Sequence, residues 1–364
     1  MTALQVLLIS SNDPRKRYRF VQRPLEAAGA DCDVFIDSHS GLSANAELRR
    51  RITSNNPDVV VLFGGDIRLG LRLAQVRQST NVPVVLRYGG NPFTARHDRI
   101  ACWIRRGRLI TSARSLLGMR VTRRSIRRCD GLIVVSKTLK QQLEPCLQSN
   151  KPIVVAPPVL ELPITPNTTP QDHSDAIRVV AVTNLAYQAK ANGINSLCTV
   201  LCRAATCLNQ TVVFDILGGG EHWRKISRRW HGTHGLLRIN CEGMARDIQP
   251  FLRSAHLFAY CSQLDSCPLS VIEAQAYGLP IFIGRHSAAT DFLTDGTDAT
   301  MFDPNDPKTA ADALVQLLSS PARMKSMQKA SHDSAIRRSE ANTVGQDLLK
   351  FFEQLLGASR VQRT

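Results

Sequence analysis

Long apolar runs are absent from this chain of 364 residues. No window approaches the ~20 uncharged apolar residues that a membrane-spanning helix requires. The apolar segment nearest the start, 4–9, has the length of a first strand and lacks the basic segment and long apolar run of a secretory signal. We therefore expect a cytoplasmic protein without a membrane span.

Paired cysteine motifs are also missing. The ten cysteines include no Cys-x-x-Cys pair. Cys198, Cys202 and Cys207 lie close together in an apolar helical stretch with no histidine near enough to complete a usual zinc set. Small buried thiols in a reducing compartment are the favoured interpretation, and a zinc site is the weaker alternative.

Acidic residues are scarce in the first part of the chain. Residues 1–160 carry 26 Lys and Arg against 11 Asp and Glu, so they hold +15 of the net charge of +16. Residues 101–129 contain nine arginines and no acid, interleaved with large apolar side chains. This pattern predicts basic amphipathic helices that contact an anionic membrane. We expect that membrane to be the inner face of the plasma membrane. A plain solvated helix face is the alternative. A nucleic-acid partner is not expected, because aromatic residues are only 5%.

Short apolar runs alternate with helical patterns along the chain. Strands are predicted at 6–10, 32–37, 58–63, 82–87, 131–136, 153–156, 178–182, 212–217, 257–260 and 280–283, and helices at 20–28, 44–54, 137–147 and 342–356. A Pro-rich polar stretch interrupts the series after residue 156. Such alternation on both sides of a linker predicts the α/β class, with two Rossmann-like doubly wound domains facing a cleft.

The predicted boundaries follow from this pattern. We expect a first domain at 1–160, a linker at 161–176, a second domain at 177–340, and a helix and tail at 341–364 that pack back on the first domain. The apolar positions of the last helix are spaced for one face, so it must pack on another element.

The segment 262–280 is the most informative for chemistry. Asp265 and Glu273 stand eight positions apart, joined by a loop that becomes a helix start. Backbone N–H groups at a helix start favour phosphate, and a carboxylate accepts hydrogen bonds from sugar hydroxyls. On spacing alone, a solvated loop acid and an ordinary helical acid explain the pair as well.

This segment resembles the E-x7-E signature of retaining glycosyltransferases with the GT-B fold, the "glycosyl transferases group 1" family. A Ser-x-x-acid loop, a helix and an Ala-x-Gly-x-Pro turn follow in the family's order, with Asp265 where the family usually has Glu. The stretch 180–193 resembles the family's strand, turn and lysine-containing segment before a helix. The resemblance implies that Lys190, Glu273 and Asp265 are catalytic, with Lys190 stabilising the departing nucleoside diphosphate.

The resemblance also implies a donor site. Gly218 and Gly219 match the family's Gly-x-Gly turn, and Gly243 and Met244 match its base-contacting segment. Ser270 and Val271 lie at the helix start, and Asn184 occupies the position of the family's usual arginine. Gly90 and Asn91 are expected to line the cleft from the first domain. The positions implied for the donor are therefore Asn184, Gly218, Gly219, Gly243, Met244, Ser270, Val271, Gly90 and Asn91.

By the same resemblance, the chain is expected to be a hexosyltransferase of cell-envelope polysaccharide biosynthesis. It would move a sugar from a UDP- or GDP-sugar to a glycan or lipid-linked acceptor with retention of configuration. The first domain would take the acceptor and the second the nucleotide-sugar, with no cofactor and no bound metal. A nucleotide-sugar epimerase of the same fold, a non-catalytic binding protein and a basic nucleic-acid binder remain as alternatives.

Overall fold

The chain forms two units, each built around its own sheet. The structure is a computed structural model that describes residues 3–11, 17–37, 42–64, 67–105, 107–147, 151–160, 176–338 and 340–361. Unit 1 comprises Met1–Leu160 with Glu340–Thr364, and unit 2 comprises Glu161–Ser339. Most of the predicted linker lies outside the described residues. Across the described part, no helix combines the length and the apolar character that crossing a bilayer would take.

Unit 1 contains a parallel sheet of six strands in the order β2-β1-β3-β4-β5-β6. The strands are β1 (Gln5–Ser11), β2 (Asp31–Asp37), β3 (Val59–Phe63), β4 (Val84–Tyr88), β5 (Gly131–Val134) and β6 (Ile153–Val155). The helices are α1 (Arg19–Ala27), α2 (Leu42–Asn55), α3 (Ile67–Ser79), α4 (Thr94–Arg105), α5 (Leu109–Arg128), α6 (Lys137–Leu143) and α13 (Ala341–Val361). The continuous Val and Leu run of β3 is buried throughout, as expected for a central parallel strand.

The last helix completes the core of unit 1. The apolar face of α13 packs with α1 against one face of the sheet. Phe352 is 0% exposed there, and Gly345 lets α13 approach the Pro24 carbonyl so closely that a Cβ at 345 would lie less than 3.0 Å from its oxygen. Residues far apart in sequence therefore close one hydrophobic core.

Two predictions for unit 1 need correction. The predicted strand 131–136 ends at Val134, because Ser136 is the N-cap of α6 and its hydroxyl accepts a 3.2 Å hydrogen bond from the Leu139 amide. The predicted helix 137–147 ends at Leu143 and continues only as a 3₁₀ turn, Glu144–Cys146. Pro145 has no N–H for an α-helical hydrogen bond, which explains the change.

Unit 2 contains seven strands in the order β13-β12-β11-β7-β8-β10-β9. They are β7 (Ile177–Val182), β8 (Val212–Leu217), β9 (Gly232–His234), β10 (Leu237–Gly243), β11 (Leu257–Tyr260), β12 (Ile281–Gly284) and β13 (Ala299–Phe302). All neighbours pair in parallel except β9, which forms an antiparallel hairpin with β10. The sequence interpretation did not include β9, β10 or β13.

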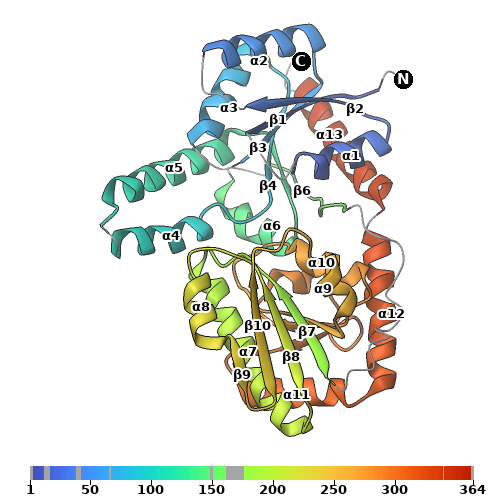
Figure 1. Cartoon of the computed structure of the whole chain (residues 1–364). Helices are drawn as coiled ribbons and strands as arrows, with labels where there is room; N and C mark the ends of the chain where they lie inside the picture. The colour runs from blue at the N-terminus through green and yellow to red at the C-terminus, as the bar shows by residue number, and fades with distance from the viewer. Residues whose placement is uncertain are drawn as a thin grey trace. The chain divides into compact units, whose positions relative to one another are not determined.

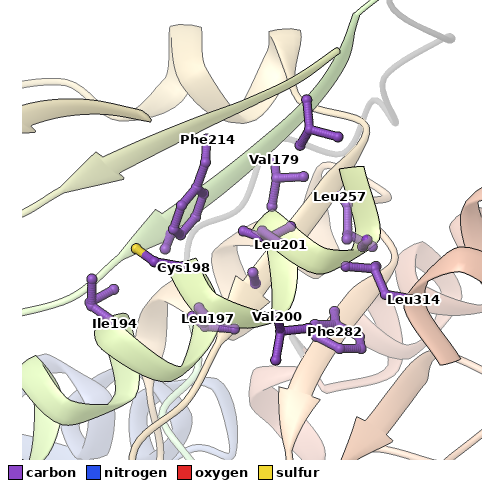
Figure 2. Packing of buried hydrophobic residues seen from close by; sticks show 14 of the residues in the cluster. Val179, Ile194, Leu197, Cys198, Val200, Leu201, Phe214, Leu257, Phe282 and Leu314 are labelled. Atoms are coloured by element: carbon purple, nitrogen blue, oxygen red, sulfur yellow. The ribbon is translucent and has the colours of Figure 1, made fainter. Parts of the chain in front are cut away.

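Helices cover both faces of this sheet (Figure 1). They are α7 (Gln188–Leu208), α8 (Trp223–Trp230), α9 (Gln249–Ser254), α10 (Leu269–Ala276), α11 (Pro307–Leu318) and α12 (Pro321–Arg338). Leu197 and Leu201 of α7 pack with Val179, Phe214 and Leu257 of three adjacent strands (Figure 2). This packing fixes α7 on one face, and residues of α9 and α10 pack on the other.

Helix α12 holds α10 in place from behind. The Ser331 hydroxyl donates to the Leu279 carbonyl at 2.7 Å, and His332 Nδ1 lies 3.0 Å from the Ala276 carbonyl oxygen. Both carbonyls belong to the end of α10 or the turn after it, and both polar side chains are buried. Buried hydrogen bonds of this kind fix the orientation of a short helix that propensity alone would not hold.

Candidate donor-binding site in unit 2

The carboxyl ends of β7 and β11 define the candidate site. The chain runs from β7 through α7 to β8 on one side, and later enters β11 on the other side of β7. The connections therefore diverge between these two strands, and ligands of open α/β sheets bind at such a switch point. Lys190 follows β7, and Asp265, Ser270 and Glu273 follow β11.

Lys190 is the third residue of α7, not a residue ahead of the helix as we expected. One turn further on, Gly193 packs on the end of β11. A Cβ at this position would lie less than 3.0 Å from the Cys261 carbonyl oxygen, so only glycine allows the contact. This close approach brings the first turn of α7 to the loop that follows β11.

Lys190 and Asp265 meet in an ion pair. The ammonium nitrogen lies 2.7 Å from Asp265 Oδ2, with the lysine side chain 10% and the aspartate side chain 25% exposed. Asp265 Oδ2 also accepts a hydrogen bond from the Tyr260 hydroxyl. Burial first, and then the Asp265 charge, raise the pKa of Tyr260 well above its ordinary value, so the phenol remains a donor.

The start of α10 is tied to the end of β7. The Ser270 hydroxyl donates to the Val182 carbonyl at 3.0 Å. Val271 is buried, and its amide donates to the Pro268 carbonyl at 3.1 Å. The amides of Leu269 and Ser270 precede the first i to i−4 hydrogen bond of the helix, so they are the donors that a phosphate would find. Any ligand contact of Val271 would involve its backbone.

Glu273 is the fifth residue of α10 and is half-buried. Burial raises the pKa of its carboxyl above the ordinary value. Among the described residues, no donor pairs with this carboxylate, in contrast to Asp265. Glu273 is therefore the acceptor of the pair that is available to a ligand hydroxyl.

The glycines after β8 form a tight junction with the loop after β7. Gly218 has φ +135°, and a Cβ there would overlap the Thr183 carbonyl. Gly219 accepts a 2.9 Å hydrogen bond from the Leu185 amide through its carbonyl. The Asn184 side chain is exposed and accepts 2.9 Å from the Ala186 amide. Asn184 therefore shapes this loop and supplies no positive charge.

Gly243 and Met244 lie beside that junction. The Gly243 carbonyl accepts a 2.6 Å hydrogen bond from the Gly218 amide, and Gly243 has φ +73°, which favours glycine. Met244 is 79% exposed, and its methyl group would lie 3.3 Å from a Cβ at Gly219. An exposed methionine next to backbone turns provides an apolar platform for a planar ligand.

Gly90 and Asn91 belong to unit 1, and they follow β4. Asn91 Oδ1 accepts hydrogen bonds from the amides of Phe93 and Thr94 at 2.9 and 3.2 Å, and its amide group donates to Gln142 at 2.9 Å. The Asn91 side chain thus caps α4 and ties it to α6. Gly90 is half-buried.

Unit 2 therefore brings together Lys190, Asp265, Ser270 and the helix of Glu273, while Gly218, Gly219, Gly243 and Met244 form the neighbouring junction. Two residues of this site were missed by the sequence interpretation, Tyr260 and Gly193. An apolar strand that ends in tyrosine gives no signal by itself.

Across the described residues, no group of three or more His, Cys, Asp and Glu side chains is placed to hold a metal ion. The cysteines at 32, 129, 146, 198, 202, 207, 241, 261 and 267 are all free.

Comparison with known proteins gives this geometry a context. Residues 176–320 match the model of the family "Glycosyl transferases group 1". Over 106 residues the chain is 26% identical to UDP-Gal:alpha-D-GlcNAc-diphosphoundecaprenol alpha-1,3-galactosyltransferase of Escherichia coli. That match spans 29% of this chain and 27% of the relative, so it covers only about a quarter of the relative's length.

Solved structures resemble the whole chain. Sucrose-phosphate synthase (tll1590) from Thermosynechococcus elongatus has a TM-score of 0.71 at 15% identity, over 97% of this chain and all of that one (100%). Anabaena Alr3699/HepE in complex with UDP has a TM-score of 0.68 at 12% identity, over 96% and 100%. The predicted α/β class with two Rossmann-like domains is confirmed, and it is the fold of GT-B glycosyltransferases.

Proposed function

We propose that the chain is a glycosyltransferase that binds the diphosphate of a nucleotide-sugar at the carboxyl edge of the unit 2 sheet. The observation that carries this proposal is the convergence of Lys190, Asp265 and the start of α10 at the switch point between β7 and β11. The match of residues 176–320 to the family supports it. So do the neighbours with UDP or UDP-glucose in their names.

The chemistry follows from the charges at this edge. The Lys190 ammonium and the first amides of α10 take the charge that develops on the departing diphosphate. Glu273 accepts hydrogen bonds from hydroxyl groups of the nucleotide-sugar. Lys190 and the first amides of α10 neutralise the diphosphate charge that a divalent ion would otherwise neutralise, so the proposed reaction needs no bound metal. We further propose a hexosyl donor and retention of configuration, on the resemblance of 262–280 to the retaining family.

A panel of UDP-, GDP- and ADP-sugars in a thermal-shift assay, followed by donor hydrolysis and transfer assays, tests the proposal. Lys190→Ala and Glu273→Ala should abolish turnover, while EDTA should leave it intact. Lys308→Ala is the matched control, since Lys308 is exposed and lies in the first turn of α11 after β13. Glu353→Ala on α13 is the control for Glu273. Full activity of the Lys190 variant would refute the assignment.

The same assays separate the two enzymatic alternatives from a binding protein. An epimerase would convert the donor sugar without an acceptor and without releasing free nucleoside diphosphate. A non-catalytic relative would bind the donor and leave it unchanged. The proposed transferase releases nucleoside diphosphate, and does so faster when its acceptor is present.

We also propose that unit 1 contacts an anionic membrane through α4 and α5, which project together from its sheet (Figure 1). The residues that α5 buries include Gly118, Thr122 and Ser125, while Leu109 and Ile110 are 65% and 79% exposed. Ile126 is buried near the end of α5, but the large apolar side chains at its start are exposed, which supports a contact surface there. The described arginines at 108, 114, 120, 123, 124, 127 and 128 are also exposed.

Apolar side chains at a helix junction, with arginines along the following helix, match the headgroup region of an anionic bilayer. The E. coli relative's name includes a diphosphoundecaprenol-linked substrate, which supports a lipid-linked acceptor here. Co-sedimentation with vesicles containing phosphatidylglycerol should fall sharply for Leu109→Ser/Ile110→Ser. Ile336→Ser on α12, also at an exposed apolar residue, should bind like the parent. Equal binding by the double variant would exclude this surface.

A further inference from the structure

Tyr260 holds a fixed position next to Asp265, the acid of the Lys190–Asp265 pair. It is the last residue of β11 and is 3% exposed. Its ring stacks on Phe258, with centroids 6.5 Å apart and an interplanar angle of 13°. The strand and the stacking together fix the direction of the hydroxyl, which donates to Asp265 Oδ2.

One oxygen of Asp265 therefore serves two donors. Oδ2 pairs with the Lys190 ammonium at 2.7 Å and accepts the Tyr260 hydrogen bond. An ammonium with a carboxylate at this distance attracts a diphosphate less than a free one does. A carboxylate that lost its ammonium to a diphosphate would be left without a partner, unless a second donor stayed with it. Tyr260 is that second donor.

From this geometry we propose that Asp265 is an exchangeable counter-ion of Lys190 instead of a sugar ligand, and that Tyr260 is the positioning residue that makes the exchange possible. When no nucleotide-sugar is bound, Asp265 neutralises the nearly buried ammonium of Lys190. When a diphosphate arrives, Lys190 turns to it, and the Tyr260 hydroxyl keeps Asp265 hydrogen-bonded. Glu273 is then the acid that contacts the donor. The inference rests on the proposed function.

Calorimetric titration with UDP, GDP and ADP tests this exchange without requiring turnover. Asp265→Asn keeps the side chain's shape and an acceptor for Tyr260 but removes the competing charge, so the nucleotide should bind about tenfold tighter. Tyr260→Phe removes the hydrogen-bond donor that remains with the Asp265 carboxylate after Lys190 has turned away, so nucleotide binding should weaken by about fivefold. In the Asp265→Asn background, Tyr260→Phe should leave the nucleotide affinity unchanged, because residue 265 then has no negative charge that needs a hydrogen-bond donor.

Tyr277→Phe is the matched control. Tyr277 follows α10, and its hydroxyl is buried without a hydrogen-bond partner among the described residues, so its loss should leave nucleotide affinity unchanged. Thermal melts identify any variant that does not fold. If Asp265→Asn does not fold, the nucleotide affinity of Tyr260→Phe is compared with that of Tyr277→Phe. Weaker binding by Tyr260→Phe alone supports the exchange, and equal binding contradicts it.

The outcomes distinguish the two proposals. If the parent protein binds none of the three nucleotides, the proposed function fails and this inference falls with it. If the parent binds but Asp265→Asn binds no tighter, only the counter-ion role is overturned. If Tyr260→Phe binds like Tyr277→Phe, the positioning role of Tyr260 is overturned.

Discussion

Gly193→Ala should destabilise unit 2, although it replaces glycine with the best helix former inside a 21-residue helix. The gain in helix propensity is about 1 kcal/mol. Against it, the new Cβ would overlap the carbonyl oxygen and carbon of Cys261, both backbone atoms that no rotamer change can move. Overpacking of this kind costs about 3 kcal/mol. The expected net loss is about 2 kcal/mol.

Urea denaturation followed by tryptophan fluorescence measures this loss, because Trp223 and Trp230 lie in unit 2 and pack on its core. Gly357→Ala on α13 is the matched control: it too lies inside a helix, but a Cβ there meets nothing within 4 Å. Because Gly357 belongs to unit 1, far-UV circular dichroism, which reports the helices of both units, follows this variant. It should be stabilised by about 0.5–1 kcal/mol. If Gly193→Ala were as stable as the parent, the close approach of α7 to β11, and with it the geometry that unites Lys190 and Asp265, would be wrong.

Three further predictions concern the packing and the titration of buried groups. Phe352→Ala on α13 should destabilise unit 1 by about 3–5 kcal/mol in urea denaturation, because the ring is 0% exposed in the core shared with α1; a loss below 1 kcal/mol would contradict that packing. The raised pKa of Tyr260 means that its contribution to stability is complete below its ordinary pKa of about 10 and is lost as pH rises toward the folded-state value. The melting temperature should therefore fall more steeply above about pH 10 in the parent than in Tyr260→Phe, and identical profiles would argue against a buried phenol. The raised pKa of Glu273 means that its ionised form is disfavoured in the fold at neutral pH, so Glu273→Gln should raise the melting temperature by roughly 2 °C while abolishing turnover; a lower melting temperature would indicate that the carboxylate has a structural partner.

The architecture of this protein was largely readable from local patterns. The Val and Leu run at 58–63, the strand at 257–260 and the amphipathic pattern near the end of the chain each appear in the structure as the strand or helix expected. Buried parallel strands and one-sided helices leave these patterns because a sheet covered on both faces, or a helix covered on one, requires them locally. The predictions failed at particular residues, such as Ser136 and Pro145, where capping and the missing N–H of proline ended an element early.

For the site, the sequence alone determined which chemical groups are present: a lysine near the first strand of unit 2, and two acids around the start of a later helix. Only the tertiary structure decided how they are paired. In the part of the chain that the structure describes, Asp265 pairs with Lys190 and Tyr260, while Glu273 has no partner. The close contact between Gly193 and Cys261, which no local pattern encodes, brings the first turn of α7 to the loop that carries Asp265. The reason is physical: periodicity reflects which face of an element is buried, whereas ion pairing depends on where the ends of strands distant in sequence come to lie.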